Sequence, residues 1–172
     1  MRKRPVFDLT AAAVIAALYT VLGYFGSAFS LTFGPVQIRF AEALTVLPFL
    51  FPAAAPGLAI GCLITNVISP YGVLDVVFGT LATAIAASLT ARAKKAWLAP
   101  LAPVLCNLMI LPPMWAWAQV NAINPAFFAA WGFNALTFLP GQLVACFGLG
   151  GLLLRWLPRI KPLREHMNPN HL

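Results

Sequence analysis

Long apolar runs separated by short polar or basic stretches dominate this chain. The runs cover residues 9–29, 40–70, 73–90, 97–117 and 126–157. A membrane-spanning helix needs about 20 consecutive apolar residues, so most of these runs are long enough to cross a bilayer once. The run at 40–70 is too long for one simple span, and Pro48, Pro52 and Pro56 interrupt it. The pattern predicts a bundle of membrane helices.

Basic residues decide how the ambiguous run folds. They gather at residues 2–4, 92–95 and 155–164, and cytoplasmic loops of membrane proteins carry an excess of Lys and Arg. All three clusters share one side only if the run at 40–70 forms two helices hinged near residues 52–56. We therefore expect a single all-α transmembrane domain, residues 1–172, with both termini cytoplasmic. Its six spans are expected over residues 9–29, 40–53, 56–70, 73–91, 97–118 and 126–157.

Composition supports this placement in lipid. The chain is 61% hydrophobic and 9% charged, whereas soluble domains carry about 25% charged residues. The net charge is +7, and most of the basic residues lie in clusters that flank the apolar runs. This distribution differs from the single basic face of a nucleic-acid-binding domain. Trp97 and Trp156 are expected at the inner interface, and Trp115, Trp117 and Trp131 near the outer one.

Motifs for catalysis and for metal binding are missing from the sequence. It contains no G-x-x-x-x-G-K-[ST], H-E-x-x-H or G-x-S-x-G motif, and His166 and His171 both lie in the tail. The three cysteines are too widely spaced for a metal motif and suit apolar packing. We expect no enzyme, no metal and no cofactor in this chain, which lacks the phosphate loop needed to hydrolyse ATP by that route.

Two acids lie within the apolar runs, Glu42 and Asp75. A charge in a membrane segment costs about 2.5–3.5 kcal/mol, so such residues usually face a cavity or a partner. Both are predicted at the outer ends of their helices, where a helix N-terminus favours negative charge. Arg39, three residues before Glu42, can lie on the same helix face. Polar residues accompany them: Gln37, Asn66, Ser69, Asn107, Asn134 and Gln142.

These polar residues allow two interpretations. Singly, each amide is most simply a hydrogen bond between helices. Together, Asn66, Tyr71, Asn134 and the two acids map to the outer half of the bundle, which favours a recess open to the outside. Carboxylates accept N–H donors and aromatic faces cover flat rings, so the recess suits a flat heterocycle with several N–H groups.

Small residues mark another candidate surface. The first helix carries a stripe of alanines that includes Ala12, Ala13, Ala16 and Ala17. Small residues let membrane helices approach closely. The stripe therefore serves either packing inside the bundle or contact with a separate membrane subunit.

Two segments carry a family resemblance. Residues 34–44 (GPVQIRFAEAL), with a turn expected at Gly34 and Pro35, and residues 66–79 (NVISPYGVLDVVFG) are similar to signatures of the QueT family. These proteins are substrate-binding S components of energy-coupling factor (ECF) transporters. The resemblance extends over nearly the whole chain and is weakest at residues 114–134.

The resemblance implies a six-helix S component of the cytoplasmic membrane. It would bind a queuosine precursor, a 7-deazaguanine base, from outside and associate with an ECF transmembrane coupling protein and two ATPase subunits. Residues implied to line or gate the site are Gln37, Arg39, Glu42, Asn66, Tyr71 and Asp75, with Asn107 and Asn134 completing the rim. Ala12, Ala13, Ala16 and Ala17 would meet the coupling protein. An S component for another vitamin or nucleobase, and a membrane scaffold without a ligand, remain the alternatives.

Overall fold

The structure is a computed structural model that describes residues 5–29, 31 and 37–169. Two sequence features fall outside these residues, namely the basic cluster at residues 2–4 and the turn expected at Gly34 and Pro35. All regular secondary structure in the described part is helical.

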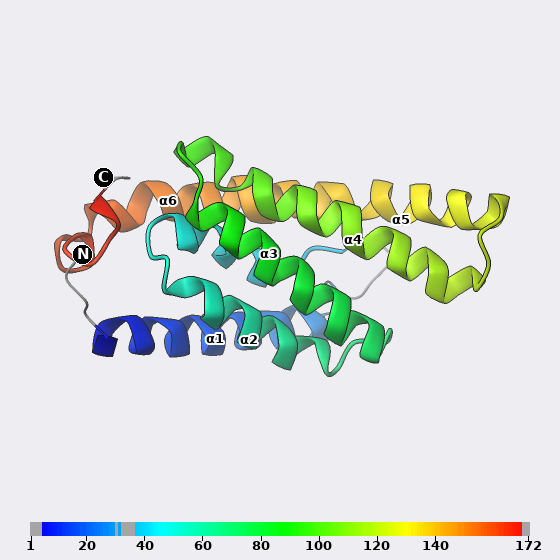
Figure 1. Ribbon diagram of the computed structural model, residues 1–172, viewed down its shortest axis with the longest axis horizontal. Coiled ribbons are helices and arrows are strands. Elements are labelled where there is room, and N and C mark those ends of the chain that lie inside the picture. Colours follow the sequence, from blue (N-terminus) through cyan, green and yellow to red (C-terminus); the bar gives the residue numbers. More distant parts are fainter. Residues whose placement is uncertain (1–4, 30, 32–36, 170–172) are drawn as a thin grey trace.

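The helices form an elongated bundle whose segments run back and forth along its long axis (Figure 1). In chain order they are α1 (Pro5–Ala28), η1 (Phe40–Phe49), α2 (Ala54–Asn66), η2 (Asp75–Gly79), α3 (Thr80–Ala91), η3 (Ala96–Leu98), α4 (Leu101–Val120), α5 (Pro125–Leu143), η4 (Val144–Gly150), α6 (Gly151–Trp156), η5 (Leu157–Arg159) and α7 (Lys161–Arg164). The start of α1 and the C-terminal segment α7 lie at the same end (Figure 1).

The run at residues 40–70 divides into two helices, with the break at residues 50–53. Both are shorter than we expected: η1 ends at Phe49 and α2 ends at Asn66. The first is a 3-10 helix with Pro48 inside it. Proline has no N–H to donate to the preceding turn, which disfavours a regular α-helix there. The fourth helix begins at Val73, as expected, and continues as a short π-helical segment over Asp75–Gly79.

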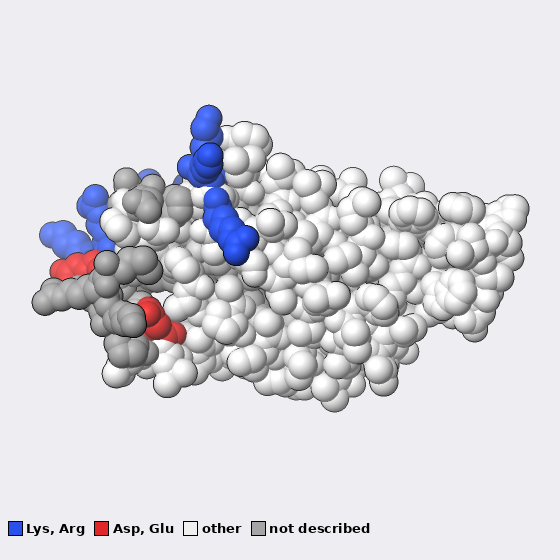
Figure 2. All heavy atoms as spheres, viewed as in Figure 1, with Lys and Arg blue, Asp and Glu red and all other residues white. Residues whose placement is uncertain are grey.

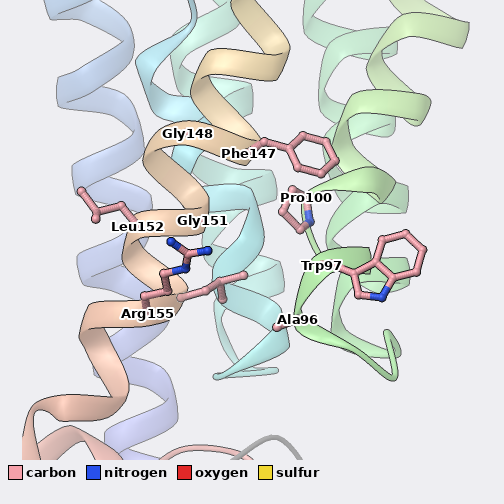
Figure 3. Close-up of a pocket in the computed structure, with 9 residues that line it drawn as sticks. Ala96, Trp97, Pro100, Phe147, Gly148, Gly151, Leu152 and Arg155 are labelled. Carbon is pink, nitrogen blue, oxygen red and sulfur yellow. The ribbon is translucent and has the colours of Figure 1, made fainter.

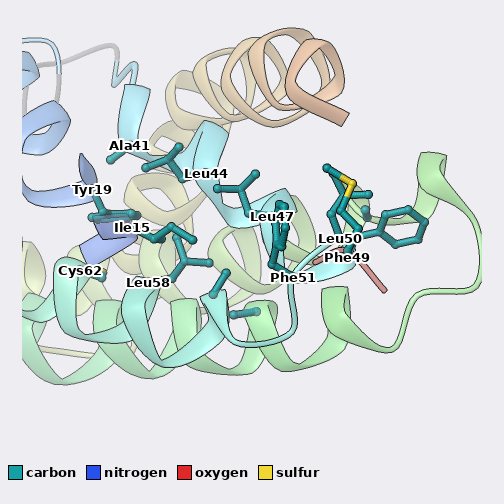
Figure 4. Close-up of a cluster of buried hydrophobic side chains, with 14 residues drawn as sticks. Ile15, Tyr19, Ala41, Leu44, Leu47, Phe49, Leu50, Phe51, Leu58 and Cys62 are labelled. Carbon is teal, nitrogen blue, oxygen red and sulfur yellow. The ribbon is translucent and has the colours of Figure 1, made fainter. Parts of the chain in front are cut away.

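The centre of the bundle is η1. Every residue from Ala41 to Phe49 is buried, and the helix contacts α1, α3 and η4. Leu44, Leu47 and Leu50 pack there against Ile15 and Leu58 (Figure 4). A helix buried on all sides places each of its polar side chains in the interior of the protein, which fixes where Glu42 lies.

Helices α1 and α2 touch through small residues. A Cβ at Gly57 would lie 2.2 Å from the Ala12 carbonyl oxygen, and one at Gly61 would lie 2.8 Å from that of Ala16. The backbones approach this closely only because both positions are glycine. Ala12 and Ala16 thus pack against α2 inside the bundle. Fewer alanines of the stripe are then available to contact a separate subunit. The exposed alanines of the set are Ala13 and Ala17.

Helices α4 and α5 form an antiparallel hairpin with a tight connection. Asn121 ends α4 in the left-handed conformation at φ 55°. Asn124 then caps α5 by accepting a hydrogen bond from the Phe127 backbone N–H at 3.0 Å, with Pro125 at the first helical position. These are the preferred residues for such positions.

The helices meet the requirements of a membrane protein by length and apolar character. Three segments are long and apolar enough to cross a bilayer, namely Val6–Ala28, Ala96–Val120 and Pro125–Arg159, and three shorter apolar ones are Phe40–Phe49, Ala54–Asn66 and Asp75–Ala91. Large apolar side chains such as Val6, Leu9, Val73 and Leu136 are exposed along the bundle. On the face shown in Figure 2, Lys and Arg lie towards one end together with a few acidic side chains, and the coloured side chains do not extend to the opposite end.

Candidate functional site

Glu42 lies in the first turn of η1, enclosed by three other helices. Its side chain is 1% exposed. The Tyr19 hydroxyl of α1 donates to Glu42 Oε1 at 2.8 Å, and Asn107 Nδ2 of α4 donates to Glu42 Oε2 at 3.0 Å. The same Asn107 amide also donates to Gln142 Oε1 of α5 at 3.2 Å. The Glu42 carboxyl group and the Asn107 amide together therefore connect four helices.

Asp75 is the second buried acid, 0% exposed. It lies in the first turn of η2, after Gly72 turns the chain with a left-handed φ of 59°. Trp115 Nε1 donates to Asp75 Oδ1 at 3.1 Å, and the Ser69 hydroxyl donates to Asp75 Oδ2. A π-helical segment widens the helix at this point, a feature found frequently at functional sites.

Arg39 and Asn66 lie between the two acids. Arg39 Nη2 donates to Asn66 Oδ1 at 2.9 Å, while Asn66 Nδ2 donates to the Asp75 carbonyl oxygen at 3.0 Å. The Arg39 guanidinium interacts electrostatically with both Glu42 and Asp75. Gly79 leaves room for this arrangement, since a Cβ there would lie 2.5 Å from Asn66 Nδ2.

We refer to these side chains together as the buried polar network. Its members are Tyr19, Arg39, Glu42, Asn66, Ser69, Asp75, Asn107, Trp115 and Gln142, and all of them are buried. They come from α1, α2, α4, α5, η1, η2 and the flanking turns. The two acids that the sequence indicated thus belong to one cluster.

Some buried polar atoms in and beside this network have no hydrogen-bond partner within the described residues. They are Asn107 Oδ1, Gln142 Nε2 and Gln37 Oε1. Buried polar groups are usually paired, and an unpaired one costs about 1–3 kcal/mol. One free acceptor on Asn107 and one free donor on Gln142, beside the buried Glu42 carboxyl group, therefore indicate a place for a polar ligand or for water.

An aromatic cluster borders the Asp75 side of the network. Tyr71 stacks on Trp115 with ring centroids 5.6 Å apart, and Phe138 meets Trp115 edge to face at 5.1 Å. Leu111 and Met114 belong to the same cluster. Tyr71 is partly exposed, whereas Trp115 is 1% exposed. The expected placement of Trp115 in an outer interfacial belt was wrong, because its indole N–H is drawn inward to Asp75.

Two further sequence expectations need correction. Asn107, expected at the rim, lies in the centre of the network because α4 packs directly on η1. The recess expected to open outward is closed, since the acids and amides within it are covered by surrounding helices. Asn134 exchanges hydrogen bonds with Gln119 at 3.4 and 3.5 Å. No bond between the described residues joins that pair to the network.

Sequence inspection did not single out Tyr19. It is fully buried in α1, but other hydroxyl residues such as Thr20 and Tyr24 lie in the same helix, so the sequence did not mark Tyr19 apart from them. Gln142 and Trp115 were noted as polar or aromatic neighbours but not as partners of the acids. Their pairing depends on how α4 and α5 are rotated about their axes.

The network can bind and orient a polar molecule but offers little for catalysis. Among the described residues, no group of three or more His, Cys, Asp or Glu is placed to hold a metal ion. The chemistry present is that of carboxyl groups, amides, one guanidinium and one phenol, which recognise N–H and C=O groups.

Comparison with known proteins agrees with this assessment. A family model described as QueT transporter matches residues 9–159. The chain is also 33% identical over 89 residues to the queuosine precursor transporter QueT of Lactococcus lactis subsp. cremoris (strain MG1363), an overlap that covers 52% of each protein. The match therefore spans about half the length of that relative. No solved structure matches this chain significantly.

Proposed function

Because this chain belongs to the QueT transporter family, we propose that it captures a queuosine precursor. Membership of this family makes it a membrane transport protein and not an enzyme. The proposed ligand is a 7-deazaguanine base, and the proposed site is the buried polar network. The observation that carries the proposal is that amide atoms without a hydrogen-bond partner, Asn107 Oδ1 and Gln142 Nε2, lie beside the buried Glu42 carboxyl group.

The hydrogen-bonding edge of a guanine-type base complements this arrangement. It presents a ring N–H and an exocyclic amino group next to a carbonyl oxygen. Glu42 offers two acceptor oxygens for the N–H groups, Gln142 Nε2 is a free donor for the carbonyl, and Asn107 Oδ1 is a further free acceptor. Hydrogen bonds to an ionised group contribute about 1.5–3 kcal/mol each, so Glu42 would supply much of the affinity.

The charges and aromatic rings favour the same class of ligand. Two carboxyl groups share one guanidinium in the network. This balance of charges favours a molecule that donates hydrogen bonds over an anionic molecule. The stacked rings of Tyr71 and Trp115, inclined by 26°, offer an aromatic face for a heterocycle. Gln37, Arg39, Asn66, Tyr71, Asp75 and Asn134 then line or gate the site around Glu42 and Asn107.

Ligand entry requires the network to rearrange, because it is closed in this structure. Asn107 Nδ2 donates to both Glu42 and Gln142, and a ligand that takes over one of these bonds releases the amide for another. The partly exposed Tyr71 lies on the side where such a path would open.

We further propose that this protein is an ECF S component of the cytoplasmic membrane with six spans and both termini inside. The basic residues at one end support this orientation by the positive-inside rule (Figure 2). It would work with a transmembrane coupling protein and two ATPase subunits that use ATP. Of the alanine stripe, the exposed Ala13 and Ala17 remain the candidate contacts with the coupling protein.

A ligand panel tests the proposed substrate. The purified chain is heated with 7-deazaguanine, 7-substituted 7-deazaguanines, adenine, riboflavin or folate, and its unfolding temperature is measured. Binding to the folded state stabilises it by about 2.7 kcal/mol at a ligand concentration 100 times Kd, so deazaguanines should raise the unfolding temperature and the others should not. Stabilisation by riboflavin or folate alone would indicate a different S component, and no stabilisation by any member would favour a scaffold.

A further inference from the structure

A groove separate from the buried polar network lies at the basic end of the bundle. Its volume is about 530 Å³. Ala96, Trp97 and Pro100 form one wall before α4 (Figure 3). The other wall comes from the end of η4 and from α6, with Phe147, Gly148, Gly151, Leu152, Leu154 and Arg155. The size falls within the range typical of small-molecule sites, about 300–1,000 Å³.

The two glycines in this groove have no packing role inside the chain. A Cβ built on Gly148 or Gly151 would meet nothing within 4 Å. Gly150, in the same run, behaves differently, since its Cβ would lie 2.8 Å from Val46 Cγ1. Glycine destabilises a helix interior by roughly 0.5–1 kcal/mol relative to alanine. Gly148 and Gly151 therefore leave a strip of backbone that is not covered by other parts of the described chain.

The charge around the groove is positive. Arg155 is the charged residue of its lining, and its guanidinium extends back along α6 towards Gly151 (Figure 3). The described cations outside the buried network are Arg92, Lys94, Lys95, Arg155, Arg159, Lys161 and Arg164, and the described acids outside it are Asp8 and Glu165. Seven cations and two acids give this part of the chain a net charge of +5.

We propose that the groove binds one anionic phospholipid from the leaflet at the basic end. Arg155 would hold the phosphate through charge-assisted hydrogen bonds, while one acyl chain would lie along Gly148 and Gly151, between Phe147 and Leu152. Trp97, 61% exposed, would sit at the headgroup level, where tryptophan is enriched in membrane proteins. Basic pockets between membrane helices are known to bind anionic headgroups.

The match to a lipid rests on the order of the lining along the bundle. Arg155 lies one turn beyond Gly151, towards the basic end, and the apolar residues Phe147 and Gly148 lie further towards the interior. A phospholipid in a leaflet has the same order, with its headgroup at the interface and its acyl chains towards the membrane centre. An apolar protein helix in the same groove would leave Arg155 without an anionic partner.

Native mass spectrometry of the full chain tests the proposal. The protein is extracted in an uncharged detergent and supplied with equal amounts of dioleoyl-phosphatidylglycerol and dioleoyl-phosphatidylcholine. We expect retention of one phosphatidylglycerol in preference to phosphatidylcholine. Arg155→Gln should lower this preference about fivefold, the effect of one cation at a membrane surface. Gly148→Leu should fill the groove and lower retention of both lipids.

Matched variants act as controls. Gly132 on α5 also has open space around its Cβ, so Gly132→Leu should retain lipid as the unmodified protein does. Arg159→Gln removes a cation that does not line the groove and should leave the preference unchanged. Equal retention of the two lipids by the unmodified protein, or unchanged retention in both Gly148→Leu and Arg155→Gln, would overturn the proposal. If Gly148→Leu does not fold, Arg155→Gln alone decides, because Arg155 is exposed.

Discussion

Replacing Glu42 with glutamine is the most informative change to the proposed site. The substitution keeps the shape of the side chain and replaces one acceptor oxygen with an NH2 donor. In the folded protein the remaining oxygen can still accept from Tyr19, as Glu42 Oε1 does at 2.8 Å. The new NH2 group would face Asn107, whose Oδ1 has no partner and can accept from it after the amide turns over.

The structure therefore predicts a small effect on folding and a large one on binding. Turning the Asn107 amide restores a hydrogen bond to residue 42 but gives up the bond that Asn107 Nδ2 donates to Gln142 Oε1. The net loss is one hydrogen bond, so the loss of stability should stay below about 1.5 kcal/mol. A deazaguanine that donates two N–H groups to Glu42 loses at least one acceptor and the charge. A loss of about 1.5–3 kcal/mol raises Kd by roughly 10- to 140-fold.

Two measurements test this prediction. Calorimetric titration with the deazaguanine that stabilises the unmodified protein best gives the Kd, and thermal unfolding of the variant without ligand gives its stability. Asp8→Asn is the matched control, because it removes an exposed acid at the start of α1 and should change neither. A Glu42→Gln variant that folds normally and binds within twofold of the unmodified protein would refute the placement of the ligand on Glu42.

Three further predictions follow from individual contacts. Gly61→Val should destabilise the bundle by about 1–3 kcal/mol, measured by thermal unfolding, because a Cβ there meets the Ala16 carbonyl oxygen at 2.8 Å; equal stability would contradict the observed helix approach. Trp115→Phe removes the N–H that donates to Asp75 at 3.1 Å and should weaken ligand binding about tenfold in titrations, and unchanged affinity would exclude Asp75 from the site. Ala13→Leu should block co-purification with the ATPase subunits without altering thermal stability, since Ala13 is exposed, and normal co-purification would count against a coupling contact there.

Much of the fold could be predicted from the sequence, because the signals are local. The apolar runs marked the helices to within a few residues, and the prolines between residues 48 and 56 marked the break between η1 and α2. The boundaries that differed most are the ends of η1, a 3-10 helix that contains Pro48, and of α2. Hydropathy measures how apolar a segment is but carries no information about its hydrogen-bond pattern.

The site was predicted only in part. The cost of a charge in a membrane marked Glu42 and Asp75 without any structure, and the helix boundaries placed each in the first turn of a helix. Tyr19 was missed, and Asn107 was expected at the rim, because their roles depend on contacts between helices. Asn107 lies 65 residues from Glu42 along the chain, and nothing in the intervening sequence fixes that pairing.

The sequence alone determined that the chain is helical and apolar, and where its main helices break, since apolar length and the positions of proline act locally. Tertiary structure decided which polar side chains meet, because the rotation of each helix about its axis is set by packing against all the others. The small residues at Gly57, Gly61 and Gly79 set how closely those helices approach. That closeness helps to enclose both acids in the buried polar network.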